Sequence, residues 1–138
     1  MSNRQEMFKP EQSSFTFNEK LNTPFLAELF EGDYQYAETV FGDFLKYLPE
    51  YSEEIDAAYR QRNIEELRKA VHKCKTLMGF VGLSEIQAQY LKMEKMCENG
   101  HAGADLDEAY NSLKQQTNEG KSLIIKEHQR LKDFNDAK

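Results

Sequence analysis

The chain has 138 residues, of which 39% are hydrophobic and 30% charged, and this composition fits one soluble domain with a single core. Its formal net charge of -6 argues against a nucleic-acid-binding protein, because binding phosphates needs Lys and Arg clustered over a whole face. No run of residues is long and apolar enough to span a membrane, and the N-terminus lacks the features of a signal peptide. We therefore expect a cytoplasmic protein that contacts neither nucleic acid nor membrane.

The two cysteines, Cys74 and Cys97, lie in no Cys/His spacing that is typical of a metal site. We expect both to be reduced thiols, and we expect no metal ligands and no cofactor on this chain. Residues 1–19 are polar and aperiodic apart from a few phenylalanines, which predicts a flexible N-terminal arm. The folded domain is then expected over residues 20–138.

The first helix is predicted just after the arm. Thr23 is expected as its N-cap, Pro24 occupies the first helical position, and Gly32 marks its end. Only about two turns fit between these signals.

A second helix is expected to be capped by Asp33. Its apolar residues recur at three- and four-residue spacing, which is typical of an amphipathic helix, until Pro49 is expected to end it. Residues 50–60 then carry a shorter apolar pattern of their own, which predicts a separate short helix.

The next two helices have clear start and stop signals. Asn63 followed by Glu66 is the Asn form of a capping box, and it predicts a helix that continues to about Gly82. Ser84 is expected to cap the following helix, which ends near Asn99.

The last helix is predicted to be long, from about Leu106 to Leu131, with a bend or a close helix contact at Gly120. No alternating strand pattern bounded by hairpin turns occurs in the sequence. The sequence therefore predicts an all-α fold: an antiparallel up-and-down four-helix bundle with one or two short extra N-terminal helices.

His72, within the stretch AVHKCKTLMGFVGL, is predicted to lie about 130° away from the apolar stripe of its helix. Its neighbours at helical spacing are Arg68, Lys69, Lys75, Thr76 and Gly79. A lone histidine on a solvent face is usually an ordinary surface residue. The cations, however, favour an approaching anion, and Gly79 costs roughly 1 kcal/mol relative to Ala in a helix interior.

The residues from His72 onward resemble the signature of the histidine-containing phosphotransfer (HPt) domain of bacterial two-component phosphorelays. In that family a lysine follows the phosphorylated histidine by three residues, an apolar-Gly pair follows it by about ten, and an apolar-Glu pair ends the next helix. The matching residues here are Lys75, Val81-Gly82, Ile86 and Met93-Glu94. In architecture the resemblance covers about residues 20–132.

The resemblance implies that His72 accepts and donates a phosphoryl group, with Lys75 stabilising the charge on that group. Arg68 and Lys69 are weaker candidates for the same role or for steering a receiver domain, and Gly79 would make room for the group. The implied partners are response-regulator receiver domains or a hybrid histidine kinase. We expect a monomeric phosphocarrier and not a kinase, because no nucleotide-binding motif is present. Any Mg²⁺ is expected only in the partner receiver domain.

One departure from the family pattern leaves two interpretations open. The family usually has glycine four residues past the histidine, where this chain has Thr76, and Leu77 and Met78 follow where small residues are common. Thr76 would either crowd a docking receiver domain or donate a hydrogen bond to the phosphoryl oxygens. The alternative functions are therefore a helical docking module that binds a receiver or kinase domain without carrying phosphate, or a four-helix bundle with an unrelated role.

Overall fold

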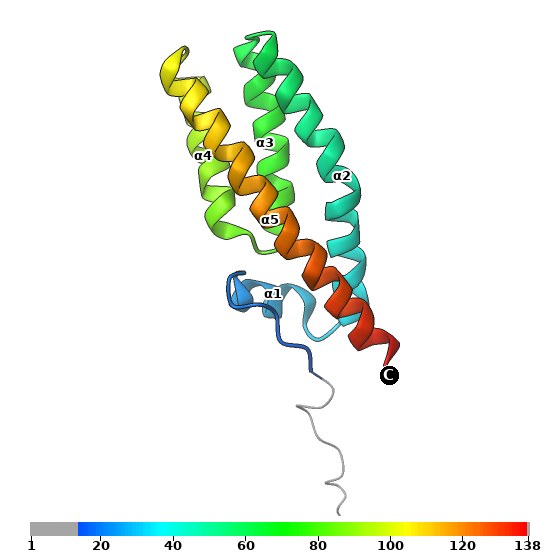
Figure 1. The fold of residues 1–138 in the computed structure, drawn as a ribbon. Coiled ribbons are helices and arrows are strands. Elements are labelled where there is room, and N and C mark those ends of the chain that lie inside the picture. Colours follow the sequence, from blue (N-terminus) through cyan, green and yellow to red (C-terminus); the bar gives the residue numbers. More distant parts are fainter. Residues whose placement is uncertain (1–13, 138) are drawn as a thin grey trace, which may run out of the picture.

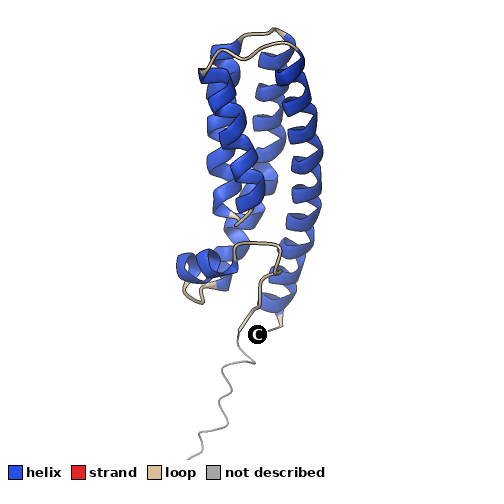
Figure 2. Ribbon diagram, turned by 90° about the vertical axis from the view of Figure 1, so that its left-hand side faces the viewer, coloured by secondary structure: helices blue, strands red, loops and turns tan. Residues whose placement is uncertain are grey.

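The computed structural model describes residues 14–137, and all regular structure in this range is α-helical. The five helices are α1 (Thr23–Phe30), α2 (Tyr34–Arg60), α3 (Ile64–Phe80), α4 (Ser84–Glu98) and α5 (Ala104–Asp136). The four long helices run antiparallel, and α1 lies across one end of them (Figure 1). Short loops join the helices at both ends of the bundle (Figure 2). The predicted four-helix bundle with a short N-terminal helix is confirmed.

Helix α3 packs between α2 and α4, and α5 packs against the same two helices on the opposite side. Each long helix buries one stripe of apolar side chains, as the three- and four-residue spacing predicts. No helix in the described part of the chain is long and apolar enough to cross a membrane.

Two of the predicted helix starts are found. The Asp33 carboxylate accepts a hydrogen bond from the backbone N–H of Tyr36 at 3.0 Å, at the start of α2. The Asn63 side chain accepts one from the backbone N–H of Glu66 at 3.2 Å, at the start of α3. Each cap satisfies one of the backbone donors that the first turn of a helix leaves without a helical partner.

Two other predicted caps are wrong. Asn22, not Thr23, caps α1, and its side chain accepts from the backbone N–H of Phe25 at 3.2 Å. Ser84 is the first residue of α4 rather than its cap, and Leu83 takes the cap position without a side-chain hydrogen bond. Ser and Thr next to a helix start are favourable at several positions, so sequence alone misplaces the cap by one residue.

Pro49 does not end the second helix, because α2 continues through it to Arg60. A proline in a helix interior removes one backbone hydrogen bond and costs about 3 kcal/mol. Buried residues on both sides of it, Leu48 before and Ile55 after, anchor both halves of α2 to the core. The separate helix expected over residues 50–60 is therefore the second half of α2.

The described part of the expected N-terminal arm packs against the bundle. Phe15 and Phe17 are buried: the Phe15 ring contacts Phe134 near the C-terminal end of α5, and the Phe17 ring contacts Phe41 in the first half of α2. The backbone N–H of Asn18 donates to the buried Glu127 carboxylate at 2.8 Å. Residues 1–13 of the expected arm lie outside the described residues.

Two glycines set close approaches between elements. A Cβ on Gly120 would lie 2.6 Å from Ile86, so this glycine brings α4 and α5 together, one of the two alternatives the sequence left open. Gly82, between α3 and α4, has φ +76°, and a Cβ there would also lie 2.9 Å from Leu26 of α1. Gly82 therefore allows both the turn between α3 and α4 and the close packing of α1 against that turn.

We expect Gly82→Ala to destabilise the protein more than Gly100→Ala. Both glycines have left-handed φ, +76° and +78°, but nothing lies within 4 Å of a Cβ on Gly100. A left-handed φ costs an L-residue about 1–2 kcal/mol, and overpacking against Leu26 adds about 1–3 kcal/mol for Gly82→Ala only. Urea unfolding of both variants measures this difference, and equal free energies of unfolding would contradict the packing role of Gly82.

Candidate functional site

The site is centred on His72, in the middle of α3. Its side chain is 57% exposed, whereas the adjacent Val71 is fully buried. The prediction that His72 lies away from the core stripe of its helix is confirmed. A partner molecule can therefore reach the ring from solvent.

Helix α4 brings a buried carboxylate, that of Glu94, against the histidine. Its Oε2 lies 2.8 Å from His72 Nδ1, and its Oε1 accepts a hydrogen bond from Lys75 Nζ at 2.7 Å. His72 precedes Gly82 by ten residues and Glu94 follows it by twelve, so the antiparallel pair α3 and α4 places them side by side. The sequence indicated Glu94 only as part of the family pattern.

The charge state of Glu94 sets the role of each ring nitrogen. Burial of the Glu94 carboxyl acts to raise its pKa, but hydrogen bonds from Lys75 and His72 outweigh burial and hold this pKa below its usual range. At neutral pH the carboxylate is therefore ionised and can only accept hydrogen bonds. In the neutral ring Nδ1 then carries the hydrogen, and Nε2 keeps its lone pair.

The other two predicted cations, Arg68 and Lys69, both form ion pairs. Arg68 donates to Glu65, with Nη2 and Oε2 2.7 Å apart, and Lys69 Nζ lies 3.5 Å from Glu66 Oε2. Each cation is thus paired with a carboxylate one turn earlier on α3. The Lys69 pair is exposed and therefore weak, so its ammonium group can turn to an incoming anion at little cost. Arg68 makes two hydrogen bonds to Glu65 and is only 29% exposed, so it is held more firmly.

The three residues that depart from the family pattern do not all face the partner. Leu77 and Met78 are both buried, although Leu77 also lines the surface groove next to His72. Thr76 is exposed, and its hydroxyl donates to the backbone carbonyl of His72 at 3.4 Å. Of the three departures, Thr76 is therefore the exposed one.

Gly79 has a packing role that sequence analysis missed. A Cβ on Gly79 would lie 2.6 Å from Nε2 of Gln87 on α4, which donates to the backbone carbonyl of Lys75 at 3.3 Å. The glycine thus lets a polar α4 side chain reach the backbone of α3. That it also makes room for a phosphoryl group stays a prediction.

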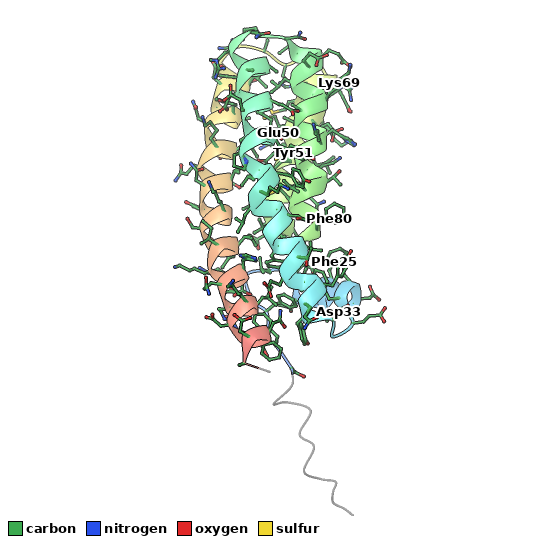
Figure 3. All side chains as sticks on the ribbon, turned by 90° about the vertical axis from the view of Figure 1, so that its right-hand side faces the viewer. Phe25, Asp33, Glu50, Tyr51, Lys69 and Phe80 are labelled. Atoms are coloured by element: carbon green, nitrogen blue, oxygen red, sulfur yellow. The ribbon has the colours of Figure 1, made fainter. Side chains whose placement is uncertain are left out.

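A surface groove beside His72 runs between α2 and α3. It is lined by Tyr51, His72, Lys73, Thr76, Leu77 and Phe80. Figure 3 shows Tyr51 and Phe80 on one face of the molecule. Lys73 bonds Glu54 at 3.2 Å and lies over the Tyr51 ring, 4.5 Å from its centroid. The sequence did not indicate Tyr51 as part of the site. The second helix was expected to end at Pro49, so nothing placed Tyr51 on a helix that packs against α3.

Among the described residues, no group of three or more His, Cys, Asp or Glu side chains could hold a metal ion.

The family model of the Hpt domain matches residues 39–133, which is more than half of the chain. The chain belongs to the Hpt domain family. Hpt domains take part in phosphotransfer in two-component signalling, as phosphocarrier modules and not as kinases, with receiver and kinase partners. No curated protein and no solved structure matches the chain. The Hpt match leaves α1 and the residues before it outside.

We expect the buried carboxylate to contribute to the stability of this Hpt domain in a pH-dependent way. Because the pKa of Glu94 is lowered on folding, its contribution is present above the unfolded-state value of about 4.3 and is lost as the pH falls through the folded-state pKa. Glu94→Gln should lower the free energy of unfolding at pH 7 by about 1–3 kcal/mol, the usual worth of hydrogen bonds to a charged group.

Urea unfolding of the wild type and Glu94→Gln between pH 7 and pH 3 measures this contribution. The difference between the two proteins should shrink toward the acid end. Glu98→Gln, at an exposed position one turn further along α4, is the matched control and should change little. A difference that stays constant with pH would contradict the ionised state of Glu94.

Proposed function

We propose that His72 is the phosphoryl acceptor and donor of this Hpt domain and relays the group between receiver-domain aspartates in a two-component phosphorelay. The observation that carries this proposal is the 2.8 Å contact between Nδ1 of the exposed His72 ring and the buried Glu94 carboxylate. That contact orients the ring and occupies Nδ1, so Nε2 is the nitrogen available to a partner.

The chemistry at His72 follows from this orientation. The Nε2 lone pair attacks the phosphorus of the receiver's aspartyl phosphate, so that a P–N bond forms while the P–O bond breaks and the aspartate leaves as a carboxylate. The hydrogen on Nδ1 stays in place during this step. The Glu94 carboxylate, 2.8 Å from Nδ1, then stabilises the positive charge that develops on the ring. The reverse reaction transfers the group to the next receiver.

Lys75 has two roles in this proposal. Its ammonium group bonds Glu94 at 2.7 Å and offsets the negative charge that would repel an incoming phosphoryl group. An ammonium has three donors, so Lys75 can also bond the phosphoryl oxygens without leaving Glu94. Lys69, in an exposed pair, and Arg68, bidentate on Glu65, would steer the acidic receiver surface through their charge. The Mg²⁺ that supports phosphoryl transfer would come with the acid cluster of the receiver domain.

Thr76 favours a second candidate function, a docking module that binds a receiver domain without carrying phosphate. Its side chain is exposed one turn from His72, where it would meet the partner. The full burial of Met78 removes one of the other two residues that motivated this alternative, whereas Leu77 still lines the groove next to His72. It predicts receiver binding without phosphohistidine.

We expect the wild type to take phosphate from a phosphorylated receiver domain, and His72→Gln to take none. The label should be labile in acid and stable in base, as phosphohistidine is. His72 is exposed, so the substitution should leave the fold intact, which circular dichroism checks.

His101→Gln is the matched control, because His101 is also exposed but lies outside the cluster. This variant should be labelled like the wild type. Phosphate label on His72→Gln at the wild-type level would contradict the proposal. Receiver binding with no label on any protein would favour the docking module.

We expect Glu94→Gln to slow phosphoryl transfer by roughly 10–100-fold, and Glu94→Ala to slow it further, while the Kd for the receiver domain stays unchanged. Gln still accepts a hydrogen bond from Nδ1 but carries no charge to meet the developing imidazolium, and Ala supplies neither. Single-turnover transfer at saturating receiver, together with a binding titration, separates rate from affinity. Equal transfer rates for wild type and both variants would exclude Glu94 as a positioning residue.

A further inference from the structure

A stacked pair of tyrosines joins α2 to α5 at the end of the bundle that lies away from α1 (Figure 1). The rings of Tyr59 and Tyr110 are nearly parallel, at 9°, and their centroids lie 3.6 Å apart. Aromatic pairs in proteins usually keep their centroids about 4.5–7 Å apart, so this face-to-face contact is unusually close.

The two tyrosines are bonded reciprocally to carboxylates. The Tyr59 hydroxyl on α2 donates to Asp107 on α5, and the Tyr110 hydroxyl on α5 donates to Asp56 on α2. Burial and these hydrogen bonds to carboxylates raise the pKa of both tyrosines, so both are neutral phenols at pH 7. Each phenol therefore already contacts a carboxylate that can accept its hydrogen as a proton.

Two cations hold the rings in place. The Arg62 guanidinium carbon lies 4.4 Å from the centroid of the Tyr59 ring, and the Lys114 ammonium nitrogen lies 5.5 Å from that of the Tyr110 ring. Neither cation fits between rings 3.6 Å apart, so each lies on the outer face of its ring. Each also bonds the aspartate that accepts from the same tyrosine. The inner faces of the two phenols are thus fixed against each other.

This arrangement suits oxidative coupling of the two phenols. Removing one electron from a phenol makes its hydroxyl strongly acidic, so the proton moves to the bonded carboxylate and a neutral tyrosyl radical remains. The unpaired electron is shared with the ring carbons next to the C–OH carbon, in π orbitals that point at the stacked ring. Two such radicals form a C–C bond between these carbons, and each ring becomes aromatic again by losing the hydrogen on its bonded carbon. The balance is two tyrosines to one dityrosine, two protons and two electrons.

We propose that Tyr59 and Tyr110 form an oxidative modification site, at which two equivalents of a one-electron oxidant join α2 to α5 by a dityrosine bond. The oxidant is a high-valent metal complex or a peroxide-activated haem, which accepts one electron at a time. Tyr59 is half-buried and gives such an oxidant access, whereas Tyr110 is 7% exposed and is reached through the stack. A bond between positions so far apart in the chain restricts the unfolded state and stabilises the fold. The inference does not rest on the proposed function of His72.

The test exposes the full chain, at a low protein concentration, to flashes of photo-oxidised tris(bipyridyl)ruthenium, a one-electron oxidant that does not need to bind. The wild type should gain dityrosine fluorescence while it stays monomeric. Tandem mass spectrometry of the digested monomer should place the bond between Tyr59 and Tyr110. Tyr59→Phe and Tyr110→Phe should each lose this signal from the monomer, because phenylalanine keeps the ring but has no hydroxyl to oxidise.

A second tyrosine pair, Tyr47 and Tyr51, is the matched control. These rings are also stacked, at 26°, but their centroids lie 6.2 Å apart and both belong to α2. Tyr51→Phe should therefore leave the monomer signal at the wild-type level. A bond between Tyr47 and Tyr51, or a monomer signal that survives in Tyr59→Phe or Tyr110→Phe, would overturn the inference.

The carboxylates are tested through the yield of dityrosine per flash. Asp107→Asn still accepts a hydrogen bond from Tyr59 but is a far weaker base, so the yield should fall several-fold. Asp105→Asn, in the same first turn of α5, should leave the yield unchanged. Equal yields in these two variants would overturn the role of Asp107 as proton acceptor.

The wild type alone decides the case in which a variant does not fold. Dityrosine that appears only in cross-linked dimers, with none in the monomer, would overturn the site without any substitution.

Discussion

The Glu94 carboxylate, buried between α3 and α4, is the interaction on which the candidate site depends. A buried charge is costly unless it is paired, and one carboxylate here satisfies two donors, the His72 ring and the Lys75 ammonium group. Because Glu94 on α4 bonds two side chains of α3 at once, it holds the two helices in one register and the His72 ring in one orientation. The His72 ring can therefore stay exposed to solvent without being free to turn.

A second buried carboxylate organises the other end of the molecule. Glu127 on α5 accepts from the backbone of Asn18 and pairs with Arg130, which in turn donates to the carbonyl of Thr16 at 2.9 Å. Together with the buried rings of the same segment, these bonds fix the chain that leads into α1. The position of α1 thus depends on polar contacts between residues more than 100 positions apart in the sequence.

Local sequence signals were reliable where tertiary contacts agreed with them. Asp33 and Asn63 cap helices because a cap needs only the next turn of its own chain. Pro49 was expected to end the helix but lies inside α2, because the cost of one proline is smaller than the gain from burying apolar residues along both halves of the helix. Phe15 and Phe17 were placed in a flexible arm for a similar reason: their binding surface is assembled from distant helices.

The sequence by itself determined the helical fold, the Hpt resemblance and the exposed position of His72, because periodicity and motif spacing are properties of the chain alone. Only the tertiary structure decided what surrounds this histidine. Glu94, Tyr51 and Phe80 come from separate turns or helices, and their meeting with His72 depends on how α2, α3 and α4 pack. Side-chain contacts between helices depend on register and rotation, which no local pattern specifies.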